Sequence, residues 1–358
     1  MKLRIYFQPW LAVILLGGAC ALLWAAGSAL AASGRLVVLP FAILYSLLFL
    51  LAAWAAARTL VLERWTEWKS PGRLLILAPH EDDCVISAGG IGARNARLGG
   101  VTRIVYLAPD EHQGMAEVRA AEARAAWQGA GVEADNLRHI RLLPPLRSRD
   151  PAMLRDAAKT LRSIIDDFKP TTVVVPMFEG GHVHHDMVAA LIGSIVRPDD
   201  PFEVFEAPEY GPYLSLFNTP HRLLALCARW LFGLVSYYGP PDGIDNRTIL
   251  KLRMVPEELA CKRRMLSAFV SQNAPSLMAT RSHCDRLVRM VPGAGKVAPF
   301  SFQASYLRFV LAARRLMWPR LVDQIFPVQL GTIGREPAIT DWRHEWDPGI
   351  AGEAQGER

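Results

Sequence analysis

The chain opens on two long runs of apolar residues, and its pattern changes at about residue 73. Neither 10–33 nor 36–57 contains a charged residue. About 20 consecutive apolar residues are enough to cross the hydrocarbon core of a bilayer. From residue 73 onward, short apolar runs alternate with longer amphipathic stretches. The pattern therefore predicts a membrane-associated N-terminal segment followed by a folded domain.

The two apolar runs are separated only by Gly34 and Arg35. So short a connection favours a transmembrane helical hairpin, within a membrane anchor that we place at residues 1–70. A cleavable signal peptide is the alternative for the first run, because basic residues precede it and Ala-Ala-Ser ends it. The run is long for a signal peptide, and a second span follows at once, so we prefer the hairpin.

Basic residues flank both ends of the predicted hairpin and predict its orientation. The connecting turn holds one arginine, whereas the outer flanks hold Lys2, Arg4, Arg58, Arg64, Lys69 and Arg73. Positive charge favours the cytoplasmic side, so we expect a bacterial inner-membrane protein whose large C-terminal domain faces the cytoplasm. The net charge of +6 suits an anionic membrane surface, although an ordinary solvated surface explains it equally well. No dense basic run with interleaved aromatic residues occurs, so we expect no nucleic-acid partner; the sequence identifies no protein partner.

The region 71–335 alternates between predicted strands and predicted helices. Short apolar runs predict strands at 74–78, 102–108, 140–143 and 172–176, and amphipathic stretches predict helices at 88–98, 115–129 and 151–168. This alternation indicates an α/β fold, with a Rossmann-like, mostly parallel sheet flanked by helices. Within 201–243, the apolar stretch 221–238 is either a buried helix or a bilayer contact. We expect residues 336–358 to form an irregular tail.

An acidic cluster follows the first predicted strand. His80 and Asp83 are three residues apart, so their side chains can converge on one ion as a helix begins. Imidazole nitrogen and carboxylate oxygen are ligands that zinc accepts. Asp82 lies beside them, where a general base would be needed. An acidic residue after a strand is also a common helix N-cap, so this cluster alone does not establish a metal site.

A histidine-rich cluster follows the strand predicted at 172–176. His182, His184 and His185 lie within four residues of a chain that has nine histidines. A histidine-rich loop on its own is often only a surface feature. Two such clusters at strand ends of one α/β domain favour a shared metal site, because ligands bind at the carboxyl edge of parallel sheets. The five cysteines are odd in number and contain no C-x-x-C pair, which argues against a disulfide framework or a cysteine-rich zinc site.

These motifs resemble those of the PIG-L (LmbE-like) N-deacetylase family. The family's His-Pro-Asp-Asp motif corresponds to His80-Glu81-Asp82-Asp83, and its His-x-Asp-His motif corresponds to residues 182–185. Weaker matches are Arg119-x-x-Glu122, which is equally well a helix-surface ion pair, and Lys262 with Ser271-Gln272. The resemblance covers about residues 72–275. This chain departs from the family pattern at Glu81, Cys84 and His184, and none of these departures removes an expected metal ligand.

The resemblance implies a zinc-dependent hydrolysis of an acetamide. It assigns His80, Asp83 and His185 as ligands of Zn²⁺, with Fe²⁺ as the alternative ion. It also implies that Asp82 is the general base and that His182 stabilises the oxyanion. His184 would orient a ligand or face solvent. Arg119 and Glu122 are weaker candidates for contacts with the substrate or with the metal ligands.

The implied substrate is an N-acetylglucosamine-type sugar, and the predicted anchor favours a glycolipid or lipid-linked intermediate. Two alternatives stay open: another metal-dependent amide hydrolase on the same scaffold, and a non-catalytic membrane-anchored protein that binds sugar. Nucleotide binding is disfavoured, because the turn after the first strand lacks G-x-G-x-x-G and carries carboxylates that would repel a pyrophosphate.

Overall fold

The computed structural model describes residues 4–6, 9–108, 114–142, 151–177, 183–207, 213–215, 244–272, 284–290 and 312–325. The chain divides into two compact units. The hairpin unit contains Met1–Glu63, Gly211–Pro240 and Ser305–Val328, and the sheet unit contains Arg64–Tyr210, Pro241–Ala304 and Gln329–Arg358. The predicted apolar segment 221–238, His182 and the predicted tail lie outside the described residues.

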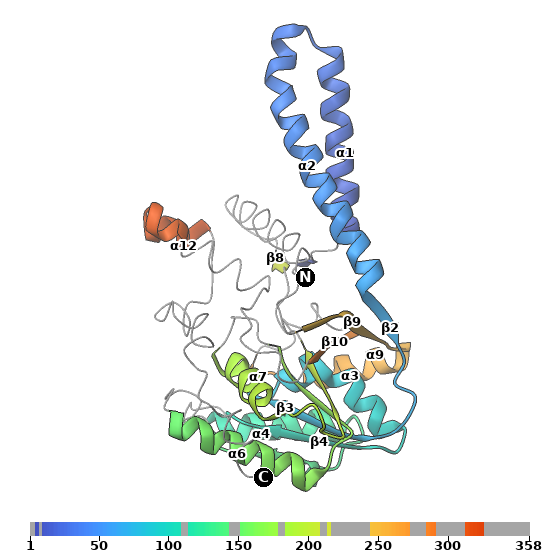
Figure 1. Ribbon diagram of the computed structural model, residues 1–358, viewed down its shortest axis with the longest axis vertical. Coiled ribbons are helices and arrows are strands. Elements are labelled where there is room, and N and C mark those ends of the chain that lie inside the picture. Colours follow the sequence, from blue (N-terminus) through green and yellow to red (C-terminus); the bar gives the residue numbers. More distant parts are fainter. Residues whose placement is uncertain are drawn as a thin grey trace. The chain divides into compact units, whose positions relative to one another are not determined.

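Two long helices, drawn in blue in Figure 1, dominate the hairpin unit. They are α1, Pro9–Ala29, and α2, Ala32–Leu62. The turn predicted at Gly34 and Arg35 is wrong, since the chain reverses at residues 30–31 and Arg35 already lies in α2. The Arg35 guanidinium donates to the carbonyl oxygens of Leu30, at 2.9 Å, and Ser28, at 3.4 Å. It thereby satisfies carbonyl groups that the end of α1 leaves without helical partners, which explains why a charged residue lies at the reversal.

Small residues let α1 and α2 approach each other. Ala12 and Ala52 are buried between them, and a Cβ atom added to Gly17 would lie 3.0 Å from the Phe49 ring. By length and composition, Ala12–Ala29 and Ala32–Trp54 are each able to cross a membrane. Their large apolar side chains point mostly outward. This exposure differs from that of a core helix in a soluble protein.

The hairpin unit also contains shorter elements. Strand β1, Arg4–Tyr6, pairs antiparallel with β8, Tyr213–Ser215. Residues 312–316 are helical and lead to α12, Pro319–Ile325.

Eight strands of the described residues form one sheet, in the order β2-β9-β10-β7-β6-β3-β4-β5. Their bounds are β2 Glu63–Thr66, β3 Arg73–Ala78, β4 Val101–Tyr106, β5 Leu137–His139, β6 Thr172–Pro176, β7 Glu203–Ala207, β9 Ile244–Arg253 and β10 Cys284–Met290. The neighbours from β7 to β5 are parallel, and β10 pairs antiparallel with β7 and β9. The predicted α/β fold with a mostly parallel sheet is therefore confirmed.

Helices cover both faces of the sheet, as expected for a parallel sheet. Their bounds are α3 Asp83–Arg97, α4 Met115–Gln128, α6 Pro151–Phe168, α7 Val183–Ile195 and α9 Pro256–Ser267. In β3, Leu75 and Leu77 pack in the core with α6 and α7, whereas Leu74 and Ile76 pack in the core with α3, α4 and α9. The alternating side chains of one buried strand thus supply two hydrophobic cores.

Two predicted boundaries differ from the structure. The strand predicted at 140–143 lies at Leu137–His139, because a short 3₁₀ turn at Ala134–Asn136 leads directly into it. The amide of Ile140 still donates to the carbonyl of Tyr106 at 2.9 Å, so pairing continues past the strand. The helix predicted from residue 88 begins at Asp83 instead. Its first turn therefore carries a predicted metal ligand.

Candidate metal centre

The two sequence motifs lie at the carboxyl ends of neighbouring parallel strands. Strand β3 ends at Ala78, immediately before the first motif, and β6 ends at Pro176, shortly before the second. Because β3 and β6 pair in parallel, these two ends share one edge of the sheet. Helix α3 begins at Asp83 and α7 carries His184 and His185 in its first turn. The strand order thus brings residues about 100 positions apart into contact.

His80, Asp83 and His185 form the group able to hold a metal ion among the described residues. Their ligand atoms all lie within 4.8 Å of one another. Oδ2 of Asp83 lies 2.9 Å from Nδ1 of His80 and 3.2 Å from Nε2 of His185. Bonds of about 2.0 Å to a tetrahedral zinc would place neighbouring ligand atoms about 3.3 Å apart. The two separations from Asp83 are close to that value, so the donor set fits zinc.

The charge state of Asp83 suits a metal ligand. Burial raises the pKa of this carboxyl, but the charges of His185 and His80 and their hydrogen bonds outweigh burial. The net effect holds the pKa of Asp83 well below its usual range. The backbone amide of His80 also donates to Oδ2 at 2.9 Å. An anionic carboxylate beside two imidazoles is a donor set that attracts a divalent cation.

Asp82 and His184 border this group. Asp82 occupies the N-cap position of α3, but its side chain makes no capping hydrogen bond. The simple capping explanation of the acidic cluster therefore does not apply to its carboxylate. His184 is buried, and its Nδ1 lies 3.0 Å from Nε2 of His80. It faces a predicted metal ligand and not solvent, which decides between the two positions that the sequence left open.

Sequence reasoning missed a polar contact between Glu81 and His139, which lies on β5, two strands from β3. Glu81, which replaces the family's proline, is fully buried, and its Oε1 lies 3.9 Å from Nε2 of His139. The His139 ring stacks on Tyr106 with centroids 4.5 Å apart. Burial and then the charge of Arg124 lower the pKa of His139. His139 is the last residue of β5, so it lies at the same sheet edge as the two motifs. That position at a strand end was the signal by which the sequence could have marked His139 as a candidate.

A buried ion pair is inserted against the backbone of α3. Lys262, from α9, pairs with Asp285, from β10, and both side chains are fully buried. Nζ of Lys262 donates to the carbonyl of Ile86 at 3.0 Å, while Oδ2 of Asp285 accepts from the amide of Ile91 at 2.7 Å. A Cβ atom added to Gly90 would lie 2.9 Å from that same Oδ2. Glycine is therefore needed for the carboxylate to reach the helix backbone.

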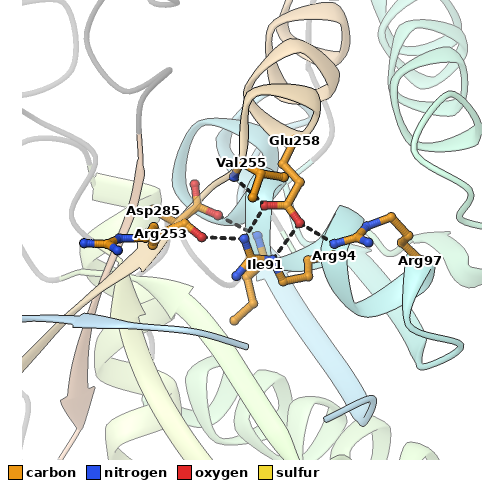
Figure 2. Close-up of polar contacts among 7 residues, drawn as sticks. All are labelled: Ile91, Arg94, Arg97, Arg253, Val255, Glu258 and Asp285. Atoms are coloured by element: carbon orange, nitrogen blue, oxygen red, sulfur yellow. Dashed lines mark hydrogen bonds and ion pairs between the residues drawn. The ribbon is translucent and has the colours of Figure 1, made fainter. Parts of the chain in front are cut away.

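A second charged cluster, centred on Glu258, ties α3 to α9 (Figure 2). Its carboxylate accepts from Nε of Arg94 at 2.7 Å, from Nη2 of Arg97 at 2.6 Å and from the amide of Val255 at 3.0 Å. Arg94 also donates to the carbonyl of Arg253. Burial raises the pKa of Glu258, but its hydrogen bonds from Arg94, Val255 and Arg97 outweigh burial and lower it overall. Together the two clusters fix the helix that carries Asp83.

Two residues of the weaker family matches, Glu122 and Ser271, contact each other. Glu122 on α4 accepts from the amide of Ser271 at 2.8 Å and from its hydroxyl at 2.7 Å. The two weak family matches thus join α4 to the turn after α9. Arg119 is half-buried on the same helix. Glu122 thus has a contact that joins two elements of the sheet unit.

The chain matches a family model over the region of both motifs. Residues 75–196 match the PIG-L family, described as GlcNAc-PI de-N-acetylase. This match includes His80, Asp82, Asp83 and the histidine-rich motif. The resemblance to the PIG-L family is therefore confirmed over that region.

Curated relatives match part of this chain. Two proteins named 1D-myo-inositol 2-acetamido-2-deoxy-alpha-D-glucopyranoside deacetylase, from Mycobacterium sp. strains KMS and JLS, are each 30% identical to it. Each match covers 32% of this chain and 46% of the relative. The chain thus spans about half the length of the curated relatives it matches.

Two solved structures are more distant. A teicoplanin deacetylase in a zinc-inhibited form is 18% identical, with 61% of this chain and 97% of that chain covered and a TM-score of 0.41. The N,N'-diacetylchitobiose deacetylase from Pyrococcus horikoshii is 16% identical. That match covers 62% of this chain and 85% of the other chain, with a TM-score of 0.35.

Proposed function

We propose that this protein is a membrane-anchored, zinc-dependent N-deacetylase that removes the acetyl group from an N-acetylated sugar. The observation that carries the proposal is the convergence of His80, Asp83 and His185, with Asp82 beside them. The PIG-L family match over residues 75–196 supports the reaction type. We place the catalytic domain at residues 71–335 and the anchor at residues 1–70.

The metal would be held by Nδ1 of His80, Oδ2 of Asp83 and Nε2 of His185, the atoms that already face one another. Zinc bound by three protein ligands supplies Lewis-acid chemistry, lowering the pKa of water and polarising the acetamide carbonyl. Fe²⁺ also accepts such ligands and is the alternative ion.

Asp82 is the proposed general base. It accepts the proton of the attacking water and returns it to the leaving amine, so that acetate and a free amino sugar result. A positioned base of this kind contributes typically 10²–10⁴-fold to the rate. His182, placed by sequence alone, is proposed to donate a hydrogen bond to the oxyanion.

His184 is proposed to orient His80. Metal-bound histidines usually pass their second ring N–H to a nearby acceptor, which fixes the tautomer and the ring. The contact between Nε2 of His80 and Nδ1 of His184 supports this role. An imidazole therefore takes the place where the family carries a carboxylate, and the ligand is oriented without an added carboxylate.

The proposed substrate is an N-acetylglucosamine-type glycolipid or lipid-linked sugar. The two membrane-length helices support a location at the bilayer, and the basic flanks support a cytoplasmic active site at a bacterial inner membrane. The names of the mycobacterial relatives support the acetamido-sugar part of the substrate. A lipid-linked N-acetylglucosamine should therefore react faster than free N-acetylglucosamine; equal rates on both would argue against the lipid requirement.

The decisive variant is Asp82→Ala in the full-length protein, with Asp83→Ala as the matched control. Released acetate and bound zinc are both measured. The proposal expects Asp82→Ala to lose at least about 10²-fold in rate while it keeps zinc, and Asp83→Ala to lose both. Unchanged turnover in Asp82→Ala would remove that residue from its role as the base.

A further inference from the structure

The hairpin unit contains a second apolar surface, at the corner between two short helical segments. Residues 312–316 are helical, and α12 begins at Pro319. The amide of Met317 donates to the carbonyl of Ala313 at 2.9 Å, which closes the first segment. The carbonyl of Trp318 accepts from the amides of Leu321 and Val322, at 3.0 and 3.1 Å. Proline suits the first position of a helix, so the corner has a defined backbone.

This corner holds large apolar side chains in solvent. Leu316 is 86% exposed and Trp318 is 82% exposed, and Met317 and Leu321 are 49% and 41% exposed. Val322, on the other side of α12, is fully buried. Single exposed apolar residues are ordinary, but here four large ones lie within six consecutive residues at one corner of the backbone. Such a surface is typical of a site that contacts a partner or a membrane.

The charges around the corner identify the partner. Arg314 and Arg315 precede the apolar residues and Arg320 lies among them, while Asp323, in α12, is the one acidic residue between 312 and 325. Tryptophan and leucine beside arginine are typical of segments that lie in the interface of an anionic membrane, where the ring occupies the headgroup layer and the cations contact lipid phosphates.

We propose that residues 314–321 dock on the surface of an anionic lipid bilayer, as a contact additional to the two spanning helices. This inference rests on the proposed membrane anchoring. Residues 305–328 belong to the same compact unit as α1 and α2, so both contacts act on one body. A hairpin alone leaves its unit free to tilt, and a second, interfacial contact would restrict that tilt.

Photocrosslinking in vesicles tests the proposal with the full-length protein. A p-benzoyl-phenylalanine replaces Trp318, or Leu316 in a second variant in case the first does not fold. Val270, which is 73% exposed in the sheet unit, is the negative control, and Leu22, which is 73% exposed in α1, is the positive control. The vesicles contain phosphatidylcholine and phosphatidylglycerol, with a fluorescent phosphatidylglycerol as the crosslinking partner.

The proposal expects lipid adducts at 318 and 316 several-fold above those at 270. Replacing Arg315→Glu and Arg320→Glu together should reduce the adducts at 318 and leave those at 22 unchanged. The interfacial contact would be overturned if position 22 gave lipid adducts while positions 316 and 318 gave no more adducts than position 270. That result would leave the proposed anchor standing. A crosslinked second copy in place of lipid would also overturn it. No adduct at 22 would contradict the membrane anchoring itself.

Discussion

The buried pair of Lys262 and Asp285 gives the sharpest test of what holds α3. Substituting Lys262→Met keeps most of the side chain's volume but leaves the Asp285 carboxylate fully buried beside the amide of Ile91. Breaking a buried ion pair by removing one partner costs about 3–5 kcal/mol, because the remaining charge is left uncompensated. For a domain of this size, roughly 2–4 °C of Tm is lost per kcal/mol. We therefore expect Tm to fall by roughly 6–20 °C.

The assay is thermal unfolding of the full-length protein in detergent, with two matched variants. Lys262→Met combined with Asp285→Asn removes both charges and keeps an acceptor for Ile91, so it should regain most of the loss. Lys69→Met breaks an exposed pair with Glu67 at 3.4 Å, and such pairs contribute at most about 1 kcal/mol. A Tm for Lys262→Met within about 2 °C of the unmodified protein, less than 1 kcal/mol, would refute the reasoning.

Three further predictions concern the same helix and its neighbours. Gly90→Ala should destabilise the protein by about 1–3 kcal/mol in thermal unfolding, because its Cβ would crowd the Met254 side chain and the Asp285 carboxylate; an unchanged Tm would contradict the close packing. The pKa of Glu258 is lower in the folded protein than its ordinary value of 4.5. The Glu258 carboxylate therefore stabilises the folded state fully at pH values above 4.5. That stabilisation is lost as pH falls through the folded pKa, and the Tm difference from Glu258→Gln should shrink on acidification below 4.5; a difference that grows would contradict the sign. His184→Ala should weaken zinc binding by about 10–100-fold in a chelator competition with little change in fold; unaltered affinity would mean that His184 does not orient His80.

Local patterns along the chain were enough to predict the strands β3, β4 and β6 and the convergence of the candidate metal ligands. The parallel strand β7 was not predicted, and the strand predicted at 140–143 was misplaced. Leu74–Ala78 is apolar without interruption, as a strand buried on both faces must be. Both motifs follow such strands directly, and the sheet edge is shared once β3 and β6 are neighbours. The convergence of His80, Asp83 and His185 therefore followed from strand-end position and residue chemistry.

Features that depend on contacts distant in sequence were not predictable. The helix was expected to begin at residue 88, but it begins at Asp83 and includes Gly90. A side chain at Gly90 would crowd Met254 and Asp285, and neither contact is visible in the local pattern. Lys262 and Asp285 come from elements whose place in the sheet no local pattern reveals. The hairpin turn was misplaced for a different reason, since a charged Arg35 lies within α2 and its guanidinium binds carbonyls at the end of α1.

The most direct test of the central claim is the metal content of the purified full-length protein, measured beside His80→Ala and His185→Ala. We expect about one zinc ion per chain in the unmodified protein, as three protein ligands and an open position imply, and its loss in both variants. A folded protein that binds no metal after zinc is supplied, or variants that retain it fully, would contradict the proposed metal centre and with it the hydrolytic mechanism.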